Sequence, residues 1–219
     1  VDMRGVATSS GRSVFAVGDG VVLVSDDGGE RFRRIPTPDI SFTAVAAFPT
    51  GAALVVAGDG SIHRYADGRF DELVPAGGAP LHGVALAGER GRALAVGDVG
   101  RALASDDAGA TWSVVTLPTA RSLRDVWLVG GGDRFVAVGD AGVVVDGPWR
   151  GSAHAVQLLG DGLTLRGIHL GADGRGIVVG DRGSVLTTDD AGATWSWFLT
   201  GDRRDVFAVD ALGDDAHHL

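Results

Sequence analysis

The chain has 219 residues, 45% of them apolar, and a formal charge of −9 that comes from 28 acidic and 19 basic residues. This length supports one substantial domain with its own core. The net acidity disfavours nucleic acid as a partner, the absence of cysteine excludes disulfides and thiolate chemistry, and no apolar run reaches the eighteen residues of a membrane span.

A Gly-Asp dipeptide that follows a short apolar run recurs five times, about forty residues apart each time. Its aspartates are Asp19, Asp59, Asp98, Asp140 and Asp181. The runs before it are β-branched and bounded by Gly or Asp, and no unit has the apolar spacing of a helix. This period is typical of propeller blades. We therefore predict an all-β fold, a β-propeller of four-stranded antiparallel blades.

In chain order the predicted blades span about residues 1–40, 41–79, 80–120, 121–162 and 163–201. Each blade divides into four strand-like runs, A to D from the propeller axis outward. In the third blade these runs are LHGVALAG, GRALAVGD, GRALASDD and TWSVVTLP.

Residues 202–219 are predicted to begin a partial sixth blade, because RRDVFAV resembles the A runs MRGVATS and LRDVWLV. The sequence also begins at Val1 without a signal-peptide pattern. We therefore expect a fragment of a propeller of six or seven blades. An open apolar edge in such a fragment would invite self-association.

An eight-residue word joins runs C and D in blades one, three and five. Asp and Gly at fixed offsets suit a tight turn, in which the carboxylate accepts backbone N–H groups and the aromatic residue returns to the core. A structural role is therefore expected for Ser25, Asp27, Gly29 and Phe32, for Ser105, Asp107, Gly109, Thr111 and Trp112, and for Thr188, Asp190, Gly192, Thr194 and Trp195. Blades two and four carry the shortened words ADGRF and VDGPW.

These words resemble the Asp-box of bacterial neuraminidase repeats, and the whole unit resembles the photosystem II assembly/stability factor-like propellers. The resemblance covers all five units. It implies a non-catalytic scaffold with a protein partner, and it favours an extracytoplasmic location, secreted or periplasmic.

Two other functions are compatible with a propeller of this kind. A sialidase-like glycoside hydrolase would need a tyrosine nucleophile with a glutamate partner, and Tyr65 is the one tyrosine beside only three glutamates. A carbohydrate-binding propeller would need an exposed aromatic platform, for which Trp197 is the candidate because it alternates with Trp195.

The starts of the A runs align in a column that we call the A-strand column. It contains Arg4, Thr43, His82, Arg124, Arg166 and Arg204. Guanidinium groups here could form a basic ring at one mouth of the channel, which would capture an acidic ligand or protein segment. Alternatively, the Gly-Asp aspartates at the same end of each blade could pair with these cations and neutralise them.

The sequence predicts no cofactor and no required metal. His63, His82, His154 and His169 occur singly. Adjacent aspartates alone do not supply the six to eight oxygen ligands of a calcium site.

Overall fold

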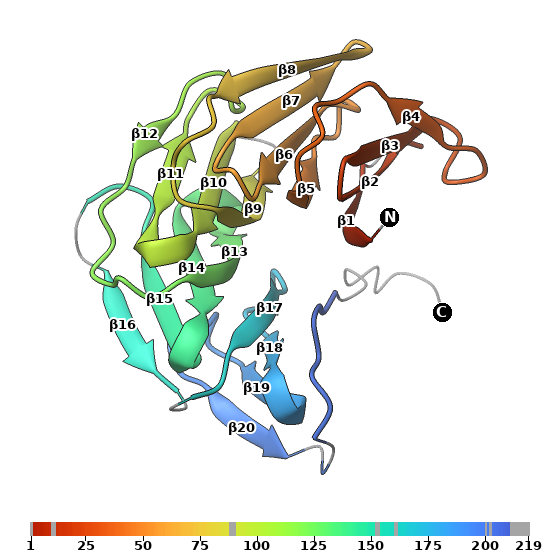
Figure 1. The fold of residues 1–219 in the computed structure, drawn as a ribbon. Coiled ribbons are helices and arrows are strands. Elements are labelled where there is room, and N and C mark those ends of the chain that lie inside the picture. Colours follow the sequence, from red (N-terminus) through yellow and green to blue (C-terminus); the bar gives the residue numbers. More distant parts are fainter. Residues whose placement is uncertain are drawn as a thin grey trace. The chain divides into compact units, whose positions relative to one another are not determined.

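The computed structural model of the protein describes residues 2–9, 12–87, 91–151, 154–159, 162–199, 201 and 203–210. Within these residues, five four-stranded antiparallel sheets are each built from four consecutive strands (Figure 1). Helix in this part of the chain is limited to 3₁₀ turns of three residues. The predicted all-β class is confirmed. The chain divides into two compact units, Val1–Thr116 and Leu117–Leu219.

The first unit holds three sheets, which we call blades one, two and three. Their strands are β1 (Met3–Thr8), β2 (Val14–Gly18), β3 (Val21–Ser25) and β4 (Arg33–Ile35), then β5 (Phe42–Ala47), β6 (Ala53–Ala57), β7 (Ile62–Ala66) and β8 (Arg69–Val74), then β9 (Leu81–Ala87), β10 (Arg92–Gly97), β11 (Ala102–Ser105) and β12 (Ser113–Val114). The turn η1 (Asp98–Gly100) lies between β10 and β11.

The second unit holds blades four and five. Their strands are β13 (Leu123–Val129), β14 (Arg134–Gly139), β15 (Val143–Pro148) and β16 (Ala155–Leu158), then β17 (Leu165–Leu170), β18 (Gly176–Gly180), β19 (Ser184–Thr188) and β20 (Ser196–Leu199). Three turns complete this unit: η2 (Gly130–Gly132), η3 (Asp140–Gly142) and η4 (Asp181–Gly183).

Strand β6 of blade two is apolar on both faces because it lies between blades one and three. All five residues of β6 are buried. Ala53 and Val55 belong to the core cluster shared with blade one, whereas Leu54 and Val56 belong to the cluster shared with blade three. Successive side chains of a strand point to opposite faces, so one unbroken apolar run supplies two cores.

The core of the second unit follows the same rule. Val136 and Val138 on β14 pack against Ile168, Val178 and Leu186 of blade five. Each of these five side chains is at most 2% exposed. Blades four and five are therefore joined by a continuous apolar layer.

Strand β1 exposes apolar side chains that are buried at the same positions of strands β5 and β9. Val6 is 69% exposed, whereas the residues at its position in blades two and three, Val45 and Val84, are each 9% exposed. Those two valines pack on the blade that precedes them in the chain. Self-association through such an edge stays a prediction.

Residues 203–210 follow blade five without an assigned strand. The segment nevertheless lies against this blade, since the Val206 N–H donates to the Gly180 carbonyl at 2.9 Å. A Cβ on Gly167 of β17 would lie 3.2 Å from the Cα of Ala208. The rest of the predicted partial blade, residues 202 and 211–219, lies outside the described residues.

Candidate functional site

Each blade brings the start of its A strand beside its own Gly-Asp turn, because the two strands are antiparallel neighbours. In blade four, Leu123 pairs with Gly139 and Asp125 pairs with Val138, so Arg124 is the extra residue of a β-bulge. A bulge re-aims a side chain. The register shifts at the same place in all five blades, and it leaves one member of the A-strand column as the extra residue in each: Arg4, Thr43, His82, Arg124 and Arg166.

This close strand approach requires the glycine of the Gly-Asp pair in blades one, three, four and five, whereas a Cβ on Gly58 of blade two would meet its nearest atom at 3.6 Å. A Cβ on Gly139 would lie 2.0 Å from the Ser122 carbonyl oxygen, and a Cβ on Gly97 would lie 1.9 Å from the Pro80 carbonyl oxygen. Only glycine leaves room for the backbone there. The next residue, an aspartate, opens the turn toward the bulge.

In the first unit the column cations pair with the aspartate of their own blade. Arg4 donates through Nε and Nη2 to the two carboxylate oxygens of Asp19 at 2.9 and 3.1 Å. His82 Nε2 lies 2.8 Å from Asp98 Oδ1. Hydrogen bonds from Arg4 and Ser41 lower the pKa of Asp19, so this carboxylate stays ionised.

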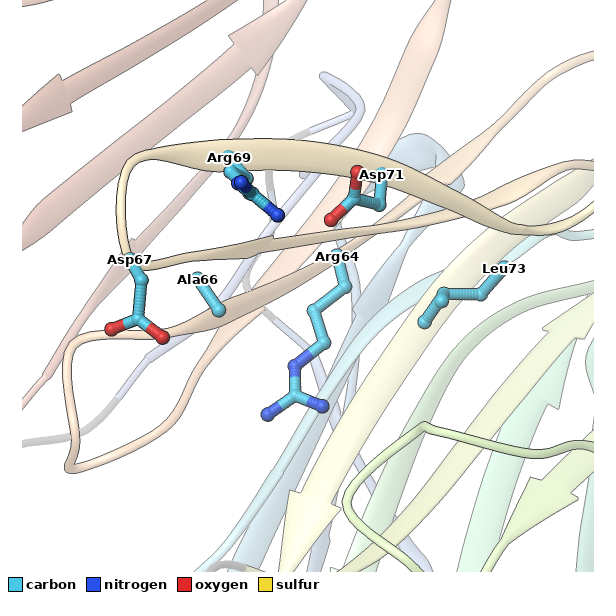
Figure 2. Close-up of a pocket in the computed structure, with 6 residues that line it drawn as sticks. All are labelled: Arg64, Ala66, Asp67, Arg69, Asp71 and Leu73. Carbon is cyan, nitrogen blue, oxygen red and sulfur yellow. The ribbon is translucent and has the colours of Figure 1, made fainter.

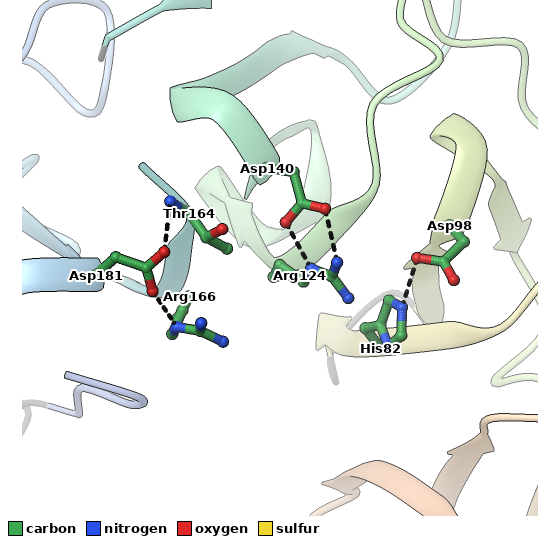
Figure 3. Close-up of polar contacts among 7 residues, drawn as sticks. All are labelled: His82, Asp98, Arg124, Asp140, Thr164, Arg166 and Asp181. Carbon is green, nitrogen blue, oxygen red and sulfur yellow. Dashed lines mark hydrogen bonds and ion pairs between the residues drawn. The ribbon is translucent and has the colours of Figure 1, made fainter. Parts of the chain in front are cut away.

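The second unit repeats the pairing. Arg124 donates to both oxygens of Asp140 at 2.8 and 2.6 Å, and Arg166 Nε donates to Asp181 Oδ1 at 2.6 Å (Figure 3). The Thr164 backbone N–H donates to the other Asp181 oxygen at 3.1 Å. Desolvation opposes ionisation of Asp181, but these hydrogen bonds outweigh it and lower its pKa.

Blade two breaks the pattern, because its column residue is Thr43. The Thr43 hydroxyl donates to the backbone of β6 and to the Leu81 carbonyl of the next blade at 2.7 Å. Asp59 instead accepts from the hydroxyl and the N–H of Ser61, whose hydroxyl also contacts His63 Nε2 at 2.9 Å. His63 is 2% exposed and stacks on the Phe70 ring at 5.0 Å.

Arg166 is held at Nε, yet its two Nη atoms have no hydrogen-bond acceptor among the described residues. The Phe207 ring lies over the guanidinium at 5.0 Å. Arg204 is exposed in the same segment, 203–210. Aspartates therefore hold the paired side chains of the column in place, while the Nη atoms of Arg166 point away from Asp181 (Figure 3).

The eight-residue words form one turn geometry in all three copies. In blade three, Ser105 Oγ donates to Asp107 Oδ1 at 2.7 Å and accepts the Gly109 N–H at 2.8 Å. Asp107 also accepts the N–H and the hydroxyl of Thr111 at 2.8 and 2.6 Å, and these hydrogen bonds lower its pKa to about 2. Trp112 closes the turn by donating to the Gly109 carbonyl at 2.9 Å.

The copies in blades one and five keep the hydrogen bonds to the aspartate. Thr188, Asp190 and Thr194 of blade five repeat the blade-three contacts at 2.6–2.8 Å, although the Trp195 Nε1–H, unlike that of Trp112, meets no acceptor among the described residues. In blade one the Arg31 N–H takes the place of the threonine N–H at 2.9 Å from Asp27. Phe32 there is 46% exposed, so the turn forms without the threonine and without a packed aromatic residue.

The turn also contacts the preceding blade, which sequence reasoning missed. A Cβ on Gly109 would lie 2.6 Å from Cδ2 of Leu54, and a Cβ on Gly192 would lie 3.3 Å from Cγ2 of Val136. Arg134 Nη1 donates to the Ala191 carbonyl at 2.9 Å. The glycine of the word is thus a packing residue between neighbouring blades as well as a turn residue.

Asp125 was also missed. It occupies the position after the column residue, where the other A strands carry Gly5, Ala44, Gly83 and Gly167. Its carboxylate accepts the N–H of Val126 at 2.8 Å and that of Ile168 on the next blade at 3.1 Å. An aspartate at a position where the other four blades have glycine or alanine was the sequence signal that could have identified it.

Tyr65 and Trp197, the candidates for glycoside hydrolysis and carbohydrate binding, differ in exposure. Tyr65 is 4% exposed and its hydroxyl is hydrogen-bonded to Arg33, whereas Trp197 is 45% exposed. In the described part of the chain, no group of three or more His, Asp or Glu residues is placed to hold a metal ion. No helix formed by these residues is long and apolar enough to cross a membrane.

Comparison with known protein-family models finds no match, and comparison with curated proteins finds none. Among solved structures, the chain is similar to one described as YCF48 bound to D1 peptide, with a TM-score of 0.67 and 19% identity over 90% of this chain and 66% of that one. It is also similar to YCF48 from Cyanidioschyzon merolae, with a TM-score of 0.69 and 16% identity over 95% of this chain and 76% of that one. The chain has the β-propeller fold, as the repeat predicted.

Proposed function

We propose that this chain is a non-catalytic protein-binding scaffold that holds an acidic segment of its partner at the A-strand column. The observation that carries the proposal is the state of Arg166. Asp181 fixes its Nε, its Nη atoms meet no acceptor within the described residues, and Phe207 covers one face of the guanidinium. A guanidinium that is already held in place loses little side-chain freedom when it binds a carboxylate.

The fold supports a peptide as the ligand. One similar solved structure is YCF48 bound to a D1 peptide, so a propeller of this fold can bind a peptide. The binding residues we assign are Arg4, His82, Arg124, Arg166 and Arg204. Because Arg4, His82, Arg124 and Arg166 pair with aspartates, these four residues would bind the partner by directional hydrogen bonds rather than by long-range attraction of a net positive patch.

Fluorescence anisotropy with a labelled peptide tests the proposal. The probe is a disordered eight-residue peptide with three glutamates at its carboxyl end, and its control carries glutamines at the same places. We expect the acidic peptide to bind the wild-type chain and the control peptide to bind much more weakly. Arg166→Gln should weaken binding roughly tenfold, about 1.4 kcal/mol, whereas Arg121→Gln, which removes an exposed arginine outside the column, should leave it unchanged.

Three results would overturn the proposal. Equal binding of both peptides would remove the carboxylate requirement. Equal losses in the Arg166 and Arg121 variants would remove the column as the site. Binding to a glycan array, or turnover of fluorogenic glycosides, without peptide binding would assign a carbohydrate-binding propeller or a glycoside hydrolase instead.

A further inference from the structure

A charged hollow lies on the outer hairpin of blade two, apart from the A-strand column. Its volume is about 630 Å³, and strands β7 and β8 with the turn between them supply its lining (Figure 2). The lining residues are Arg64, Ala66, Asp67, Arg69, Asp71 and Leu73. Nothing in the proposed function uses this surface.

The β7–β8 hairpin has one charged face and one aromatic face. Arg64 pairs with Asp71 and Ala66 pairs with Arg69 across the strands, so these four residues share the face with the hollow. The intervening residues Tyr65 and Phe70 face the aromatic core with blade one. The residues of the charged face therefore do not take part in packing that core.

Arg64 has no polar partner in the described part of the chain. Its Nε is buried and has no hydrogen-bond acceptor. Its guanidinium instead lies over the Phe48 ring, whose centroid is 6.0 Å from the guanidinium carbon. Figure 2 shows the guanidinium extending away from β8, although Asp71 is its cross-strand neighbour.

A buried N–H without an acceptor is unfavourable, and so is a partly desolvated cation without an anion. An anion that enters the hollow and accepts from the Nη atoms of Arg64 would relieve the second cost. The two Nη atoms of an arginine form a fork that matches the two oxygens of a carboxylate. Arg69 also lines the hollow and supplies a second cation.

The other lining residues narrow the class of ligand. Asp67 and Asp71 border the same hollow, so a doubly charged phosphate would meet about twice the repulsion that a single carboxylate meets. Leu73 and Ala66 offer apolar contact to the body of the ligand. We propose that this hollow is a binding site for a monocarboxylate with an apolar body, and that Arg64 holds its carboxylate.

Titration of the whole chain, observed at the Arg64 side-chain Nε–H resonance by nuclear magnetic resonance, tests the site. The resonance is identified by its loss in Arg64→Lys. Benzoate is the probe for a free acid, N-acetylphenylalanine is the probe for a peptide carboxyl end, benzamide is the uncharged control, and inorganic phosphate is the competing anion. We expect either carboxylate to shift the resonance saturably and benzamide to leave it in place; the tighter carboxylate identifies the source.

The benzoate affinity of three variants then shows which arginine binds the carboxylate. Arg64→Gln should weaken benzoate binding at least about tenfold, and Arg69→Gln should weaken it less. Arg175→Gln is the matched control, because that arginine is 81% exposed and lies 3.8 Å from its nearest acid, Asp173. Thermal unfolding verifies that each variant is folded.

The proposal is overturned if neither carboxylate moves the wild-type resonance, if benzamide moves it equally, or if phosphate binds more tightly than both carboxylates. Unchanged benzoate affinity in a folded Arg64→Gln variant would also overturn it. The wild-type titration alone is decisive even if that variant does not fold. Loss of acidic-peptide binding at the A-strand column would leave this result untouched, because none of these residues belongs to the column.

Discussion

The carboxylate of Asp125 accepts the backbone N–H of Ile168 at 3.1 Å, and so it joins the A strands of blades four and five. Its other oxygen accepts the N–H of Val126 at 2.8 Å. Desolvation exceeds the effect of these two hydrogen bonds and raises the pKa of Asp125 to about 6. The contact between the two blades therefore includes a carboxylate that ionises at a mildly acidic pH.

The raised pKa predicts that the folded state loses stability as the pH rises, because ionisation places a charge in a desolvated site. Between the unfolded pKa of 3.8 and the folded pKa of about 6, the folded state binds more protons than the unfolded state. The contribution of Asp125 to stability is thus fully present below pH 3.8 and is lost as the pH rises through 6, a loss of about 3 kcal/mol.

Asp125→Asn removes the titration and keeps the shape of the side chain. Urea unfolding of both proteins between pH 4 and pH 7.5 should give a wild-type advantage that shrinks as the pH rises. A difference in free energy of unfolding that stays constant over this range would contradict the assignment.

For the eight-residue turn we predict the opposite pH dependence: its contribution to stability is lost as the pH falls. Hydrogen bonds from the hydroxyl and N–H of Thr194 and from the hydroxyl of Thr188 lower the pKa of Asp190 to about 2. Its stabilising contribution is present above pH 3.8 and is lost as the pH falls toward 2. We expect Asp190→Ala to lower the melting temperature at pH 7 by more than Asp189→Ala does, and this gap to narrow on acidification. Equal melting temperatures at pH 7 would show that the turn does not depend on this carboxylate.

The recurrence of Gly-Asp and of the eight-residue word was sufficient to predict the blades, because both signals are local and repeat in every unit. The pairing of Arg124 with Asp140 was foreseen only as one of two alternatives, since the bulge that decides it depends on strand register. The inter-blade role of Gly109 was not foreseen, because Leu54 lies far from it in sequence. The unpaired state of Arg64 depends on side-chain direction, which a repeat pattern does not encode.

Gly109 and Gly29 test the inter-blade role of the turn, since both glycines have the same place in the word. Their φ angles are +82° and +95°, so alanine is strained at either place, by about 1 kcal/mol. At Gly109 the new Cβ would also lie 2.6 Å from Leu54, whereas at Gly29 the nearest atom is 3.9 Å away. Gly109→Ala should therefore cost about 1–3 kcal/mol more than Gly29→Ala. Urea unfolding measures both, and equal costs would mean that backbone strain alone accounts for the glycine.

His63 supplies a last test, in blade two. Desolvation lowers the pKa of this ring from 6.5, and it outweighs the opposing fields of Glu72 and Asp59. The unfolded state therefore binds more protons than the folded state just below pH 6.5, so that stability falls as the pH drops from 6.5 toward the folded pKa.

The matched substitution is His63→Leu, because leucine occupies the same strand position in blades three and five as Leu103 and Leu186. The ring packs between Phe42 and Phe70, where leucine can retain the apolar contact, and Ser61 keeps its hydrogen bond to Asp59. We expect His63→Leu to be less sensitive than the wild type to a change from pH 7.5 to pH 5, as measured by urea unfolding. If both proteins lose the same free energy of unfolding over that interval, His63 is not the group whose protonation destabilises blade two.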